Sequence, residues 1–180
     1  MMFLFGDTET TGFPSNSRKA DDPKQARLVQ LAAQLVTADN RTVMEFSLII
    51  NPGVPIPEAA SNVHGITDEI AQKYGVSEAT AVDFFLNLRA HCDADVFHNA
   101  AFDRKIMSHA IERRGKDGSK VMAEVKSLCT MLQVKGKGHQ KANLAYCMRE
   151  FFDEDHALAH DAMADTVACR RVFFHLNPTT

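Results

Sequence analysis

The sequence has no excess of positive charge, no closely paired cysteines and no long apolar run. Its formal net charge is −3 and its pI is about 6.2. No global positive field would recruit nucleic acid, which argues against a simple sequence-independent DNA coat. This charge balance leaves open an enzyme that meets phosphates through metal ions.

Cysteine usage and hydropathy indicate the compartment. The four cysteines are widely spaced, without a C-x-x-C pair, and lie in apolar segments: Cys92, Cys129, Cys147 and Cys169. They are typical of reduced core thiols in a cytoplasmic protein. No apolar stretch approaches the ~20 residues that cross a bilayer, and the N-terminal segment lacks the basic residues of a targeting signal. We therefore expect a cytoplasmic protein with no membrane segment.

Chain length and composition favour one domain. The chain has 180 residues, of which 45% are hydrophobic, enough for a core that folds without disulfides or metal staples. It contains no repeat, linker or low-complexity block. We expect a single domain over residues 1–180.

Hydrophobic patterning predicts a mixed α/β fold. Three β-prone segments, residues 2–8, 28–37 and 42–50, come first, and the polar turn ADNR between the second and third predicts a hairpin. The proline-rich NPGVPIPEAA then ends this part of the sheet. Helices and two short strands follow.

Caps and breakers divide the rest of the chain. Thr67 and Ser77 are predicted helix N-caps. Gly75 is predicted to end a helix as a C′ glycine in the left-handed backbone conformation. The expected strands are 94–99 and, more weakly, 123–129; the expected helices are 68–75, 78–92, 100–115, 142–152 and 162–176, with a basic loop at 135–141. This order predicts an α/β sandwich with a mixed sheet.

Two carboxylates follow the first apolar run. In FLFGDTETTG, residues 3–12, Asp7 and Glu9 lie two positions apart on a predicted strand, so they share a face and Thr8 takes the other. Like charges at the end of a buried strand repel each other and lose hydration. Either a cation lies between them, or they are solvated and one caps the turn around Gly12.

Acidic residues occur beside histidine at two later places. FHNAAFD, residues 97–103, puts Asp103 in the first turn of a predicted helix, where the helix dipole alone favours an acid. HDAMAD, residues 160–165, opens the last helix. There Asp161 fits an N-cap, and Asp165 lies one turn further in.

Convergence of these acids predicts a metal site. Four carboxylates stay ionised together in a partly dry cleft only if cations neutralise them, and hard oxygen ligands suit Mg²⁺ or Mn²⁺. Two such ions ~3.5 to 4 Å apart are the usual device for phosphodiester hydrolysis. A base must then accept a proton from water, and His160 is the candidate.

Three motifs together carry a family resemblance. DTETTG, HNAAFD and HDAMAD resemble, in order and spacing, the exonuclease motifs of the DEDDh group of DnaQ-like 3′ to 5′ exonucleases, which includes the proofreading epsilon subunit of bacterial DNA polymerase III. VHGIT, residues 63–67, resembles a family segment near the terminal nucleotide of the substrate. The resemblance implies the RNase H-like fold, a five-stranded mixed sheet flanked by helices.

The resemblance also implies residue roles. Two divalent cations, Mg²⁺ or Mn²⁺, would be bound by Asp7, Glu9, Asp103 and Asp165, with His160 as the general base. Around the 3′ end of the bound strand it places Thr11, His64, Asn99 and Phe102. His98 is expected to support the strand end, and His156 matches no motif.

The sequence departs from the family pattern at two positions, and it ends early. Gln30 stands where Glu is common and Cys129 where Asp is common; neither position is a metal ligand in the family, so the departures concern subgroup and substrate. The chain ends at Thr180, without the C-terminal segment that the epsilon subunit uses to hold its polymerase. A polymerase partner and a free-standing nuclease are therefore both open.

Three functions are compatible with these motifs. The first is removal of 5′-mononucleotides from 3′ ends of single-stranded DNA, and the second is the same chemistry on RNA 3′ ends, since nothing in the motifs reads a 2′-hydroxyl. The third is a non-catalytic nucleic-acid-binding module. It is disfavoured because a binding module has no physical use for unneutralised acids in a cleft.

Overall fold

Strand β1 (Met2–Thr10) runs through the middle of the sheet in the computed structural model, which describes residues 1–178. It pairs antiparallel with β2 (Leu28–Thr37) and parallel with β5 (Ala94–Phe97). Further out, β3 (Thr42–Asn51) pairs antiparallel with β2, and β6 (Lys126–Cys129) pairs parallel with β5. The resulting sheet is mixed.

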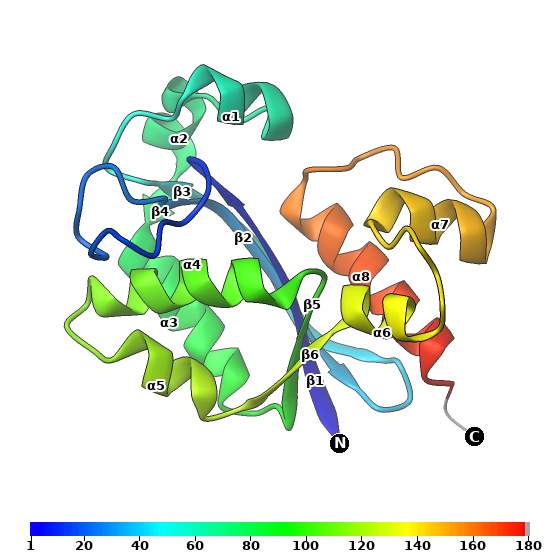
Figure 1. Ribbon diagram of the computed structural model, residues 1–180. Coiled ribbons are helices and arrows are strands. Elements are labelled where there is room, and N and C mark those ends of the chain that lie inside the picture. Colours follow the sequence, from blue (N-terminus) through cyan, green and yellow to red (C-terminus); the bar gives the residue numbers. More distant parts are fainter. Residues whose placement is uncertain (179–180) are drawn as a thin grey trace.

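Helices cover both faces of this sheet (Figure 1). One layer consists of α3 (Glu78–Arg89), α4 (Ala100–Glu112) and α5 (Gly118–Ala123). The other consists of α6 (Thr130–Gly136), α7 (Leu144–Phe152) and α8 (Ala162–Leu176). Two short helices, α1 (Glu58–His64) and α2 (Asp68–Tyr74), follow β3.

Alternation along β1 decides which way the acidic motif points. Leu4 belongs to the core under α3 and α4, whereas Phe3 and Phe5 face α8, where their ring centroids lie 4.9 and 5.4 Å from that of Phe173. Since every second residue of a strand shares a face, Asp7 and Glu9 project on the α8 side of the sheet. The core thus aims the two carboxylates at the start of α8.

The predicted RNase H-like architecture is confirmed, but the sheet has six strands where five were expected. The additional strand, β4 (Val76–Ser77), pairs parallel with Ile50 and Asn51 at the end of β3. Two residues are too few to give a period-2 pattern, so hydrophobic alternation did not indicate it. Ser77 also caps α3, as predicted, by accepting the N–H of Thr80.

Short helices account for the other differences. Sequence patterns did not predict α1, α5 or α6. Helix α5 overlaps the expected strand 123–129 only at Ala123, and α6 overlaps the expected basic loop only at residues 135–136. Helices of six or seven residues carry too few turns for a clear period. The longest helix, α8, has the predicted bounds of Ala162–Leu176.

Gly75 ends α2 for a reason other than the one expected. Its φ is −73° and its ψ is 135°, so it is extended and not in the left-handed conformation of a C′ glycine. A Cβ there would overlap the carbonyl oxygen of Ala71 and lie 2.5 Å from the backbone nitrogen of Asn51. Close approach of α2 to β3 therefore requires the glycine.

Two further expectations concern thiols and membranes. All four cysteines are free, and Cys147 and Cys169 are buried. Within residues 1–178, no helix has both the length and the apolar character needed to cross a bilayer.

A buried ion pair joins the α3–α5 layer to the sheet. Arg89 Nε donates to Asp95 Oδ2 at 2.9 Å, and both side chains are almost fully buried. The guanidinium also donates to the backbone carbonyls of Val121 and Met122. Arg89 therefore connects α3, β5 and the end of α5.

We predict that Asp95→Ala lowers the free energy of unfolding by about 3 kcal/mol, because it leaves the Arg89 charge buried without its carboxylate. Equilibrium urea denaturation measures this. Asp39→Ala is the control, since Asp39 and Arg41 form an exposed pair whose atoms are 4.0 Å apart. Equal effects of the two changes would contradict the role given to the buried pair.

Candidate active site

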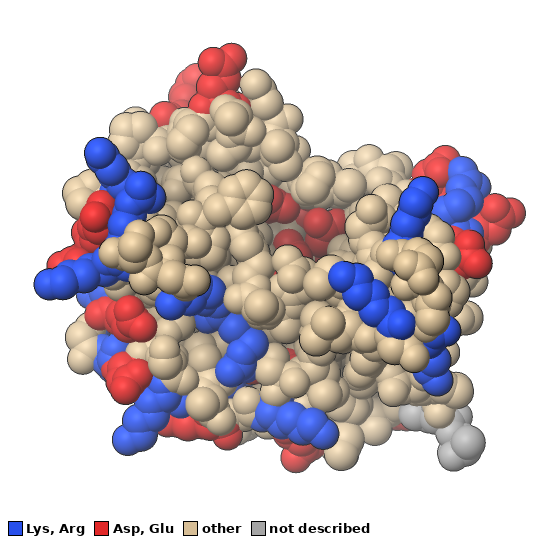
Figure 2. Space-filling model, in the orientation of Figure 1, with Lys and Arg blue, Asp and Glu red and all other residues tan. Residues whose placement is uncertain are grey.

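Four carboxylates from three separate segments line one pocket of about 500 Å³. Asp7 and Glu9 come from the end of β1, Asp103 from the first turn of α4, and Asp165 from the first turn of α8. Figure 2 shows acidic side chains at the bottom of a hollow in the surface. The convergence expected from the sequence is therefore present.

Asp103 is positioned by β1 and by the helix that carries it. Asn99, in the left-handed conformation with φ 65°, precedes the first turn of α4 and lets the chain turn sharply from β5 into the helix. Thr8, on the face of β1 opposite Asp7, donates its hydroxyl hydrogen to Asp103 Oδ1 at 2.8 Å. Asp103 is 2% exposed, so this bond holds a nearly buried carboxylate in place.

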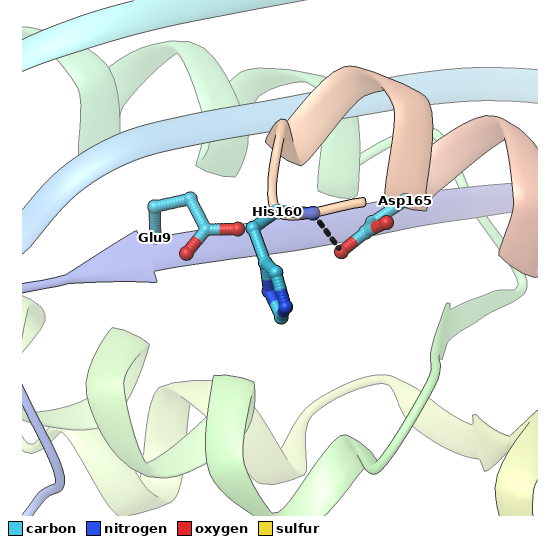
Figure 3. Close-up of side chains that lie close together, drawn as sticks. All are labelled: Glu9, His160 and Asp165. Atoms are coloured by element: carbon cyan, nitrogen blue, oxygen red, sulfur yellow. Dashed lines mark hydrogen bonds between the residues drawn. The ribbon is translucent and has the colours of Figure 1, made fainter. Parts of the chain in front are cut away.

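Asp161 and His160 define the approach to the last helix. Asp161 caps α8, as predicted, by accepting the N–H groups of Met163 and Ala164. His160 has a φ of 69°, and its N–H donates to Asp165 Oδ2 at 3.3 Å. In Figure 3, His160 lies between Glu9 and Asp165. One ligand atom from each of these three residues lies within 4.8 Å of the other two.

His156 contacts the same carboxylate. Its Nε2 lies at hydrogen-bond distance from Asp165 Oδ1, and the histidine side chain is only 8% exposed. The sequence motifs gave His156 no role because the residue lies outside all of them. His156 lies between α7 and α8, nine residues before Asp165, and no spacing rule applied to the sequence would have shown this contact.

Burial and mutual repulsion both raise the pKa values of three acids in the pocket. Burial, followed by repulsion from Asp103 and Asp165, raises the pKa of Asp7 well above its usual value. Burial and the same two neighbours raise the pKa of Glu9 to about 8. Burial raises the pKa of Asp103 to about 7, although its hydrogen bond from Thr8 acts in the opposite direction. The protein alone therefore does not stabilise these groups as anions.

The donor set suits a hard divalent cation. In the described part of the chain, no Lys or Arg forms an ion pair with any of the four carboxylates, and none lines the pocket. Carboxylate oxygens are the ligands that Mg²⁺ and Mn²⁺ prefer. A cation bound here would supply the missing positive charge, which fits the prediction made from the sequence.

The residues predicted to surround the substrate also line the pocket: Thr11, His64, Asn99 and Phe102. Thr11 is fixed by two bonds of 3.0 Å with the backbone of Arg27, and the Nδ1 atom of His64 accepts the N–H of Ile66. Burial lowers the pKa of His64.

The pocket also has lining residues that the sequence analysis did not place around the substrate. Phe13, which lines the pocket, is 88% exposed, and its ring centroid lies 6.0 Å from that of Phe102. Gly12, with a φ of +149°, turns the chain between the strand and this ring. His98 also lines the pocket, and its Nδ1 is 2.8 Å from Thr130 Oγ1. The aromatic residue after DTETTG was the available signal for Phe13.

Comparison with known proteins assigns the family. The family model described as Exonuclease (RNase_T) matches residues 4–173. The chain belongs to this exonuclease family. Its resemblance to the DnaQ-like members is confirmed by relatives named as DNA polymerase III epsilon subunits.

Two curated relatives show the extent of the similarity. A DNA polymerase III subunit epsilon-like protein of Rhodobacter capsulatus is 30% identical over 99% of this chain, which spans 24% of that protein. The DNA polymerase III subunit epsilon of Rickettsia conorii is 28% identical over 94% of this chain, which spans 71% of that protein. The similarity thus extends along almost the whole of this chain, which spans about a quarter of the first relative.

A solved structure shares the fold. E. coli exonuclease I in complex with a dT13 oligonucleotide superposes with a TM-score of 0.80 at 19% identity, over 98% of this chain and 41% of the other. This similarity establishes that the chain shares the fold of the matching part of exonuclease I.

We predict that the exonuclease loses stability between about pH 4.5 and 8 in EDTA through Glu9. The folded protein holds a proton on Glu9 that the unfolded chain releases near its usual pKa, so stability is present at low pH and lost as pH rises through about 8. Glu9→Gln keeps the neutral form and removes this contribution. Its melting temperature relative to the unchanged protein should rise with pH.

Thermal melting in EDTA from pH 5 to 8.5 measures this difference, and Mg²⁺ should reduce it by stabilising the ionised Glu9. A constant difference across this range would contradict the raised pKa of Glu9.

Proposed function

We propose that this chain is a divalent-metal-dependent 3′ to 5′ exonuclease that removes 5′-mononucleotides from single-stranded DNA. The observation that carries the proposal is the convergence of four carboxylates in one pocket without a Lys or Arg partner among residues 1–178. Membership in the exonuclease family supports the reaction class. The proposed ligands of two cations, Mg²⁺ or Mn²⁺, are Asp7, Glu9, Asp103 and Asp165.

Each part of the site has a proposed task. Divalent cations held by the carboxylates would activate a water molecule and stabilise charge on the leaving oxygen. A ring nitrogen of His160 accepts the proton that the attacking water loses. His160 is exposed at the pocket, so its ring can reach a substrate that enters from solvent. Thr8 and His156 hold the carboxylates of Asp103 and Asp165 through their contacts with them.

The pocket walls support a single-stranded substrate. Phe13 and Phe102 present aromatic rings, and Val63 and Ala60 of α1 add apolar surface. Bases stack on aromatic rings only when they are unpaired and splayed from a helix. We assign the 3′-terminal nucleotide to this wall, with Thr11, His64 and Asn99 beside it. The presence of a dT13 oligonucleotide in the exonuclease I complex supports a DNA strand as the substrate class.

The proposal is tested with a 5′-labelled single-stranded DNA oligomer and its RNA counterpart, each in Mg²⁺, in Mn²⁺ and in EDTA. We expect a ladder that shortens from the 3′ end with either metal and no products in EDTA, with DNA degraded faster than RNA. Faster degradation of the RNA oligomer would indicate that RNA 3′ ends are the substrate. Tight oligomer binding without hydrolysis in any metal would favour the binding module and refute the enzyme.

Asp7→Ala serves as the inactive reference in this assay, with circular dichroism as the check that the chain is folded. Normal turnover by this variant would refute the assignment of the metal ligands. Because the substitution removes a carboxylate whose pKa is raised by burial and repulsion, we expect no loss of folding in EDTA.

We predict that His160→Ala lowers kcat by about 10²-fold, the usual contribution of a general base. Metal dependence and oligonucleotide KM should change little, because the carboxylates and the apolar wall stay in place. His91→Ala is the matched control, since His91 is an exposed histidine that does not line this pocket. Single-turnover rates measure the effect, and equal rates for the two variants would exclude His160 as the base.

A further inference from the structure

Gln30 is a buried polar residue of β2 that lies beside the pocket without lining it. It is 6% exposed and pairs across the strands with Glu9, so both side chains project on the same face of the sheet. Glutamine is seldom buried unless its amide is fully hydrogen-bonded. The partners of this amide therefore indicate what the residue does.

The side-chain amide of Gln30 forms hydrogen bonds with three residues. Its Oε1 accepts the N–H of Ala162 at 3.1 Å, which fixes the orientation of the amide because that donor requires an oxygen. Its Nε2 donates to Asp161 Oδ2 at 3.1 Å and to Ser47 Oγ at 3.2 Å. One side chain of β2 thus holds two consecutive residues at the start of α8.

Asp161 is occupied on both oxygens as a result. Its Oδ1 caps α8 and its Oδ2 receives the Gln30 amide. Asp161 is also close enough to Asp7 and Glu9 to add to the rise in their pKa values, although less than burial does. Gln30 therefore keeps the carboxylate of Asp161 apart from the four carboxylates proposed to bind metal. It also fixes Asp161 and Ala162, which lie between His160 and Asp165.

We propose that Gln30 is a positioning residue for the reaction, acting through Asp161 and Ala162 on His160 and Asp165; this inference rests on the proposed function. Glutamate at this position would keep an acceptor for Ala162 but lose both donors and face Asp161 with a like charge. Glutamine, with one acceptor for Ala162 and two donors for Asp161 and Ser47, is thus a residue type that fits this helix start.

The test compares Gln30→Met with Gln34→Met. Both residues are buried on the same face of β2 and both lose side-chain hydrogen bonds, but Gln34 bonds to Glu45 and Arg170, away from the start of α8. We expect Gln30→Met to lower kcat by about 10-fold to 100-fold, as small misplacements of catalytic groups do. Oligonucleotide KM should stay within about a factor of two, and Gln34→Met should leave kcat unchanged.

A double variant in which the hydrogen-bond donor and acceptor are exchanged tests whether activity can be restored. In Gln30→Glu with Asp161→Asn, the donor and acceptor exchange places, and asparagine still caps the helix. Each single change should lower kcat and the double variant should recover it, a coupling that a double-mutant cycle isolates. If Gln30→Met does not fold, Asp161→Asn, at the partly exposed helix start, carries the test.

Hydrogen exchange of the metal-free protein gives a readout that is independent of activity. Gln30→Met should speed exchange at the amides of residues 160–165 and Gln34→Met should not. The proposal is overturned if the two methionine variants have equal kcat, or if the double variant is no faster than its singles. Absence of hydrolysis by the unchanged protein would instead refute the proposed function, while hydrogen exchange would still report on Gln30.

Discussion

Burial of a cluster of carboxylates that repel one another is the constraint on which the site depends. The pKa values of Asp7, Glu9 and Asp103 are all raised, in each case first by burial. A fold that only needed stability would replace such a cluster with apolar or paired residues, because unpaired buried charge is costly. The scaffold instead holds the acids where they repel each other. A bound cation would stabilise this arrangement by neutralising their charge.

Rigid elements hold the acids in this position. The alternation of β1 sends Phe3 and Phe5 into the core beside α8 and, by the same geometry, sends Asp7 and Glu9 to the start of that helix. Thr8, on the other face, donates to Asp103. Since β1 pairs with β2 on one side and β5 on the other, a shift of the acidic motif would break the sheet on both sides.

Local periodicity and motif order made much of the site predictable from the sequence. Period-2 alternation placed Asp7 and Glu9 on one face, and capping rules located Asp161 and the bounds of α8. The residues assigned to the site from the motifs all line one pocket, although their roles remain predictions. The contacts of His156 and Gln30 depend on the folded path of the chain before α8, and neither periodicity nor spacing describes such contacts. Strand β4 escaped prediction because two residues have no period.

Charged and apolar surface lie in different parts of the pocket. Its bottom is acidic, its wall carries Phe13 and Phe102, and no Lys or Arg lines it within the described chain. A phosphate would be repelled by this bottom unless cations were bound there, whereas a base would be attracted to the rings with or without them. Stacking on the wall and neutralisation at the bottom are therefore separable contributions to the proposed binding of a nucleic-acid strand. The net charge of −3 agrees with a chain that meets phosphates through ions more than through its own basic side chains.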